Sequence, residues 1–121
     1  MRILLWREIN FITEAIFRVI FKSSMLMSEF FTESYKWLHE NVATDMFQAI
    51  EEIFSSNELN TQKALKNYAV KHYPDTLDYD VNKIVSGLWF KLYRIEINFG
   101  LAMDLITEEE FKELDRCLCC I

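Results

Sequence analysis

The chain has 121 residues, and its 13 basic and 19 acidic side chains give it a formal net charge of −6. This acidic balance argues against a nucleic acid as partner, because binding to phosphates requires a basic surface. Apolar residues make up 51% of the chain, which is typical of a globular domain, yet only two glycines and one proline are present. Because sheets and tight turns use those two residue types often, we predict an all-α fold with a single helical domain over residues 1–121.

Residues 1–22 show the spacing of an amphipathic helix. Arg7, Glu14, Arg18 and Lys22 recur on one stripe, which we predict to face solvent. The residues predicted to face the core are Leu5, Ile9, Ile12, Ile16, Val19 and Ile20. Because charged residues interrupt the apolar run, we expect neither a membrane span nor a secretory signal in this segment.

The next helical pattern follows Ser23-Ser24, and we expect Ser24 to cap it. No glycine or proline separates the two patterns, so residues 3–42 form either one long helix or two. A start signal at residues 43–45 and a short apolar face predict a further helix as far as Phe54. The cluster Ser55-Ser56-Asn57-Glu58 then predicts a loop.

Two more helices are predicted from their end signals. Asn60 or Thr61 begins the first of them, and Pro74 ends it, because proline disfavours helical geometry in the residue before it. The run Thr107-Glu108-Glu109-Glu110 is a capping box that begins a short closing helix. The inner face of the closing helix is predicted to consist of Phe111, Leu114 and Leu118.

The stretch from Asp78 to Ile106 carries the longest amphipathic pattern in the chain. Its polar stripe consists of Lys83, Gly87, Lys91, Arg94 and Asn98, and its apolar arc of Ile84, Val85, Leu88, Leu92, Ile95 and Phe99. So wide an apolar arc must be covered on most sides. We therefore predict a bundle of four to six helices around a central helix at about residues 80–103, capped by Asp78 or Asp80.

No group of residues predicts catalysis or a cofactor. Cys117, Cys119 and Cys120 lie close together, but no second Cys or His pair completes a zinc motif, so we predict no metal site. His39 and His72 lack a neighbouring nucleophile or paired carboxylate at helical spacing. We therefore expect a protein that is not an enzyme. Cysteines clustered in this way, and not spread as disulfide pairs, favour a reducing cytoplasmic location.

Glu96 lies on the apolar side of the predicted central helix. A carboxylate among apolar residues needs a partner or acquires a raised pKa, and functional carboxylates occur in such settings. The interpretation we favour from the sequence is an edge position with a hydrogen bond to Asn82, an Arg or a Tyr.

Aromatic residues make up 15% of the chain, and two of them lie where the helical spacing predicts solvent. Phe11 falls in the charged stripe of the first helix, and Phe90 borders the basic stripe of the central helix. Aromatic side chains surrounded by charge are typical of protein interfaces. The residues predicted to bind a partner are Phe11, Phe90, Trp6, Trp37, Arg7, Arg18, Lys91 and Arg94. The alternative is that contacts between helices of one chain cover these rings.

These observations predict a non-enzymatic protein–protein interaction module whose partner is another protein or a second copy. An inhibitor, an adaptor or an immunity-type factor would fit, and small acidic helical proteins of this kind occur among phage, viral and mobile-element products. Two alternatives remain open. One is a homo-oligomeric regulator that senses a ligand in a pocket of the bundle. The other is a membrane-surface protein that uses its first helix and its cysteine-rich tail, although a membrane is the less expected partner.

Overall fold

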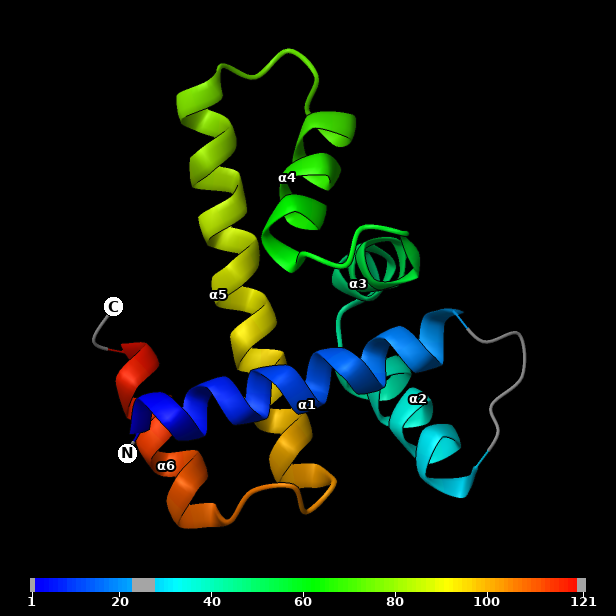
Figure 1. Ribbon diagram of the computed structural model, residues 1–121, viewed down its shortest axis with the longest axis vertical. Coiled ribbons are helices and arrows are strands. Elements are labelled where there is room, and N and C mark those ends of the chain that lie inside the picture. The colour runs from blue at the N-terminus through cyan, green and yellow to red at the C-terminus, as the bar shows by residue number, and fades with distance from the viewer. Residues whose placement is uncertain (1, 23–27, 120–121) are drawn as a thin grey trace.

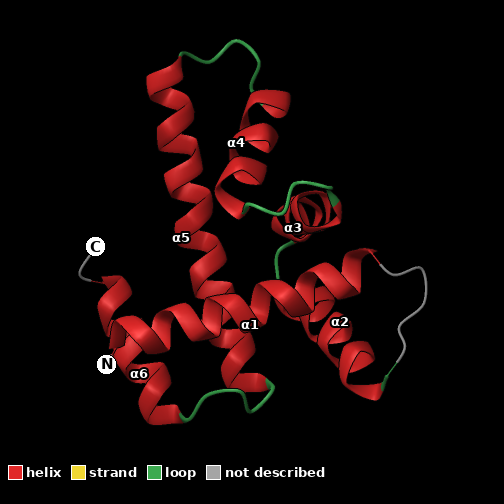
Figure 2. Ribbon diagram, viewed as in Figure 1, coloured by secondary structure: helices red, strands yellow, loops and turns green. Residues whose placement is uncertain are grey.

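The computed structural model describes the backbone of residues 2–22 and 28–119 and, within these ranges, the side chains of residues 8–22, 28–77 and 80–118. All regular secondary structure in these ranges is helical, which confirms the predicted all-α class (Figure 2). The helices are α1 (Arg2–Lys22), α2 (Glu29–Asn41), α3 (Thr44–Ser55), α4 (Thr61–His72), α5 (Asp78–Ala102) and α6 (Glu108–Cys119).

Helix α5 is the central element of the bundle, as predicted. It is 25 residues long and packs against α1, α2, α4 and α6. Figure 1 shows α4 beside the N-terminal half of α5 and α1 lying across its C-terminal half. Its N-cap residue is Leu77, so the prediction that Asp78 or Asp80 caps it is wrong. A cap at Asp80 would require the helix to begin about one turn later than it does. Asp80 instead lies inside the first turn, where its carboxylate interacts favourably with the helix dipole.

The apolar interior forms two clusters that share α1 and α5. The larger one gathers side chains from α1 to α5 and is built around Phe17, which is fully buried. The Phe17 ring meets the rings of Phe54 and Phe99 edge-on, at centroid distances of 5.5 and 5.2 Å. Such edge-to-face pairs add to the stabilisation that burial alone provides. The smaller cluster joins α1, α5 and α6 and consists of Ile9, Ile97, Ile106, Leu114 and Leu118.

The first 42 residues contain two helices and not one. Helix α1 ends at Lys22, and α2 begins at Glu29. Ser28 caps α2, because its side-chain oxygen accepts a hydrogen bond from the Phe31 backbone N–H at 3.2 Å. Ser24, the predicted cap, lies outside the described residues.

Two predicted helix starts in the second half are confirmed by their hydrogen bonds. Asn60 caps α4 by accepting a hydrogen bond from the Lys63 backbone N–H at 3.0 Å. The capping box of α6 is complete in both directions. The Glu110 N–H donates to Thr107 Oγ1 at 3.1 Å, and the Thr107 N–H donates to Glu110 Oε1 at 2.8 Å.

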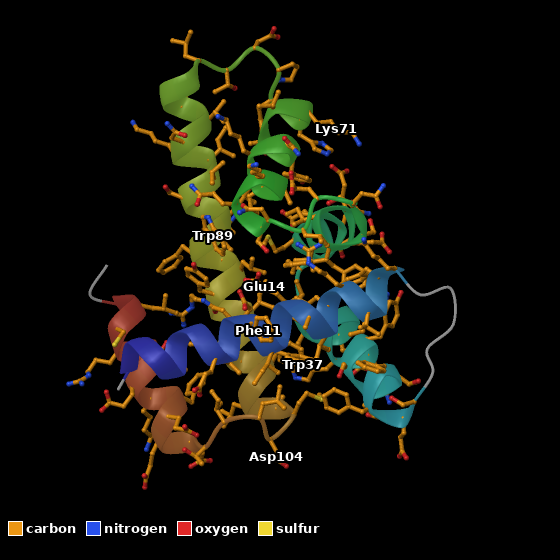
Figure 3. All side chains as sticks on the ribbon, viewed as in Figure 1. Phe11, Glu14, Trp37, Lys71, Trp89 and Asp104 are labelled. Carbon is orange, nitrogen blue, oxygen red and sulfur yellow. The ribbon has the colours of Figure 1, made fainter. Side chains whose placement is uncertain are left out.

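The C-terminus of α5 is closed by a left-handed residue at Asp104, which lies at the foot of the molecule in Figure 3. Its φ is 57°, a conformation in which a Cβ is unfavourable. The turn is a Schellman motif, since the Leu105 N–H donates to the Gly100 carbonyl at 2.8 Å and the Asp104 N–H to the Leu101 carbonyl at 3.2 Å. These bonds turn the chain from α5 toward α6. The strained residue therefore helps to place α6 beside α5, where both helices contribute to the smaller apolar cluster.

Replacing Asp104 by Gly should therefore stabilise the protein. Glycine removes the Cβ strain at positive φ, while its greater freedom in the unfolded chain offsets part of the gain, leaving about 0.5–1 kcal/mol. Chemical denaturation of Asp104→Gly and Asp104→Ala measures the effect. Both variants lose the carboxylate, but only glycine relaxes the backbone. An alanine variant more stable than the glycine variant would show that position 104 is not strained, because only the unfolded-state entropy would then separate the two.

Candidate interaction surface

Helix α1 has a buried apolar side and an exposed apolar side. The buried side contacts the bundle through Ile9, Thr13, Phe17 and Ile20, each of which is at most 3% exposed. The exposed side carries Phe11, Ile12, Ala15 and Val19. Phe11 lies opposite Ile9 and Thr13, and Ile12 and Val19 lie along the border with the buried side. Contiguous exposed apolar surface of this kind marks a candidate interaction site.

The prediction that Ile12 and Val19 face the core is wrong. They are 42% and 44% exposed, whereas Thr13 and Phe17, which lie on the other side of the helix, are fully buried. The physical reason is the contact between α1 and α5, which turns Thr13 toward Glu96 and Phe17 toward Phe99. The apolar residues of α1 are compatible with several rotations of the helix, and these two contacts select one of them.

The exposed side forms a continuous stripe that we name the α1 outer face. Its members recur at intervals of three or four residues, so they share one side of the helix. They are Glu8, Phe11, Ile12, Ala15, Val19 and Lys22. The centre of the stripe is apolar, and a charge of opposite sign lies at each end. Phe11 is its most exposed member at 77% and lies in front of the α1 ribbon in Figure 3.

One edge of the α1 outer face is fixed by hydrogen bonds to Leu59, which lies between α3 and α4, and to Thr61, the first residue of α4. Glu14 Oε1 accepts a hydrogen bond from Thr61 Oγ1 at 2.6 Å, and Arg18 Nη2 donates to the Leu59 carbonyl at 3.0 Å. The Arg18 guanidinium also lies 5.3 Å from the centre of the Phe54 ring. Burial raises the pKa of Glu14, while the hydrogen bond from Thr61 and the charge of Arg18 oppose that shift.

These contacts change the interpretation of Arg18. The sequence placed it on a solvent-facing stripe as a partner-binding residue, but it is half-buried and already makes contacts within the chain. Leu59, whose carbonyl Arg18 binds, is 72% exposed and extends the apolar surface beside α1. Arg18 therefore holds an apolar neighbour in place at the rim of the α1 outer face.

The other predicted partner-binding residues are distributed over the molecule. Phe90 is 42% exposed on α5, and Lys91 beside it is also exposed. Phe11 points away from α5, because it lies opposite Ile9 and Thr13 on α1, so the fold does not bring it into contact with Phe90. The side chains of Trp6 and Arg7 lie outside the described residues.

Trp37 and Arg94, in contrast, lie at one site. They line a hollow of about 300 Å³ between α2 and α5, together with Asn41, Val42, Ile95 and Asn98. The volume is at the lower limit for ligand pockets. The Trp37 ring packs edge-on against Phe99, and Arg94 Nη1 lies 3.2 Å from the Asp115 carboxylate of α6. Because both side chains already have partners within the chain, this hollow is a weaker candidate than the α1 outer face.

Glu96 lies at the crossing of α1 and α5 and is fully buried, so the interpretation of an edge position is wrong. Its Oε2 lies 2.5 Å from Thr13 Oγ1, and its Oε1 is buried without a hydrogen-bond partner. Burial raises the pKa of Glu96 well above its ordinary value, and the nearby Glu14 raises it further, against the effect of the Thr13 hydrogen bond. Burial and these two carboxylates also raise the pKa of Tyr93 to about 12.

The proton balance at this crossing fits a neutral Glu96. The Thr13 hydroxyl has a single proton, and the Ile9 carbonyl accepts from it at 2.8 Å. One hydroxyl proton cannot serve both oxygens, and a protonated Glu96 would supply a second proton to its contact with Thr13 Oγ1. The neighbouring acid, Glu14, is hydrogen-bonded to Thr61, so we assign the Thr13–Glu96 contact to helix packing.

The remaining reactive side chains do not form a site. His72 Nε2 lies 3.0 Å from both carboxylate oxygens of Glu52, in an exposed pair on the surface of α3 and α4. His39 is exposed and stacks on Tyr35. Among the residues that the structure describes, no group of three His, Cys, Asp or Glu side chains could hold a metal ion, and no helix is long and apolar enough to cross a membrane. Cys117 is exposed, and the side chains of Cys119 and Cys120 lie outside the described part.

Comparison of the chain with known protein families, with curated proteins and with solved structures finds no match.

The raised pKa of Glu96 predicts a pH-dependent stability. Above the ordinary glutamate pKa of 4.5, the folded state retains a proton that the unfolded state releases, so the free energy of unfolding falls as the pH rises. Glu96→Gln keeps the shape but cannot ionise. We therefore expect the variant to unfold at higher denaturant concentration than the wild type at pH 7, with little difference near pH 4.

The control is Glu33→Gln, which removes an exposed carboxylate from α2. This variant should follow the wild type at both pH values. A Glu96→Gln variant that is less stable than the wild type at pH 7 would show that Glu96 is ionised in the folded protein.

Proposed function

We propose that this chain is a non-enzymatic protein–protein interaction module that binds its partner through the α1 outer face. The observation that carries the proposal is the stripe of exposed apolar side chains on α1, whose most exposed member, Phe11, lies opposite the buried Ile9 and Thr13. Contiguous exposed apolar surface surrounded by charge marks interaction sites on soluble proteins. Phe11 is the proposed anchor, because an aromatic ring buries a large area at a low cost in side-chain entropy.

The charges around the stripe support the same proposal. Glu8 and Lys22 close its two ends, and the Glu14–Thr61 and Arg18–Leu59 hydrogen bonds hold one long edge. A rigid edge lowers the entropic cost of binding, because fewer side chains must be immobilised when the partner docks. An inhibitor, an adaptor or an immunity-type factor would need only such a surface, with no catalytic group.

The proposal predicts that Phe11 contributes little to the stability of the monomer. Because its ring is 77% exposed, Phe11→Ser should change the free energy of unfolding by about 0.5 kcal/mol or less. Phe17→Ala on the buried side of α1 is the control and should cost about 3–5 kcal/mol. Chemical denaturation in dilute solution gives both values. A loss for Phe11→Ser as large as that for Phe17→Ala would show that the ring belongs to the core.

Photo-crosslinking tests whether the face binds a protein. The chain carries p-benzoylphenylalanine at position 11 or, as a control, at Tyr73, an aromatic residue that is 49% exposed beyond the end of α4. Each form is irradiated in an extract of cells that naturally express the chain, and the products are identified by mass. The proposal expects a defined adduct with a protein, either another chain or a second copy, from position 11 and not from position 73. Absence of any adduct specific to position 11 would contradict it.

A further inference from the structure

The α1 outer face is complementary to a second copy of itself. Ala15 lies midway between Glu8 and Lys22, seven residues from each, and midway between Phe11 and Val19, four residues from each. If a second α1 lies antiparallel across the first with the two-fold axis at Ala15, Glu8 of one copy faces Lys22 of the other at both ends. The same arrangement places each Phe11 against a Val19 of the other copy.

We infer that the partner of the α1 outer face is a second copy of this chain, bound antiparallel about Ala15. This inference rests on the proposed function, which by itself requires only that the face bind some protein. Two-fold symmetric dimers are the most common assemblies of soluble proteins, and their interfaces must be self-complementary. The α1 outer face is self-complementary in charge, because Glu8 faces Lys22 of the other copy. It is also complementary in shape, because the large Phe11 faces the smaller Val19, and the face is exposed on the surface of the fold.

The charges at its ends select the antiparallel orientation. A parallel pair would place Glu8 against Glu8 and Lys22 against Lys22, and like charges held together disfavour association. An antiparallel pair forms two Glu8–Lys22 ion pairs in their place. Ala15, the smallest residue of the stripe, lies at the centre, where it allows the two helix axes their closest approach.

The surface around the stripe leaves room for this partner. Figure 1 shows α1 in front of α5, with no helix in front of α1, and the side chains of the α1 outer face are exposed. Leu59, which Arg18 holds at the rim, adds apolar area on one flank. A contact made by one helix face and its rim is at the small end of specific interfaces, so the dimer should dissociate on dilution.

Charge exchange tests the pairing of Glu8 with Lys22. Sedimentation equilibrium over a range of concentrations gives the dimer dissociation constant of the wild type, Glu8→Lys, Lys22→Glu and the double variant. Each single exchange creates two like-charge contacts across the two-fold axis and should raise the dissociation constant about tenfold or more. The double variant restores two ion pairs with their signs reversed, and it should recover the wild-type constant to within a few-fold. Circular dichroism confirms that all four proteins are folded.

A disulfide tests the position of the axis. In a chain with Cys117, Cys119 and Cys120 replaced by Ser, Ala15→Cys should crosslink two copies rapidly under mild oxidation, because a residue on the axis meets itself. Ala102→Cys is the matched control, since Ala102 is an exposed alanine on α5 far from the stripe in sequence. It should crosslink only slowly.

The outcomes separate this inference from the proposed function. A wild type that stays monomeric at every concentration overturns the second-copy inference, as does a dimer whose dissociation constant is unchanged by the single exchanges or not recovered by the double one. In each of these cases the proposed function still stands if photo-crosslinking at position 11 captures a different protein. Failure of both experiments would remove the function as well.

Discussion

The crossing of α1 over α5 is the contact on which the rest of the structure depends. Thr13 meets Glu96 there at 2.5 Å, and Ile9 packs against Gly100, where an added Cβ would lie 2.9 Å from Ile9 Cδ1. Small side chains at the crossing let the two helices approach closely, and the buried hydrogen bond fixes the rotation of α1. Because each apolar cluster contains residues of both helices, this single crossing orients the packing of the whole bundle.

The same crossing determines which side of α1 faces water. If α1 were rotated to bury Ile12 and Val19, Thr13 would leave Glu96, and a fully buried carboxyl would lose its hydrogen-bond partner. An unsatisfied buried polar group is costly. The buried Thr13–Glu96 pair and the exposed α1 outer face therefore both result from the same rotation of α1 about its axis. The interaction surface proposed for this protein depends on the hydrogen bond that Thr13 makes with one oxygen of a buried acid.

The helices could be predicted from local patterns, whereas the surface could not. The capping box at Thr107, the cap at Asn60 and the length of the central helix are signals within a few turns of the chain, and the structure bears them out. The rotation of α1 depends on Glu96, which lies 83 residues away from its partner. A helical wheel of residues 1–22 offers several apolar arcs and no information on which arc meets α5. One signal was present: Phe17 and Thr13 share a side, and Glu96 needed a polar partner, which the sequence suggested could be Asn82, an Arg or a Tyr but which is Thr13.

The rotation of α1 about its own axis is tested most directly by nuclear Overhauser effects. These report which residues lie close to the isoleucine methyl groups of α1 in the native protein. With α1 rotated as described, the δ-methyl of Ile9 lies against Gly100, whereas the Ile12 side chain is 42% exposed. We therefore expect strong contacts from the Ile9 methyl to the α-protons of Gly100, and none from the Ile12 methyl to those protons. Contacts between Ile12 and Gly100, with Ile9 free of Gly100, would contradict the rotation of α1 and with it the proposed interaction surface.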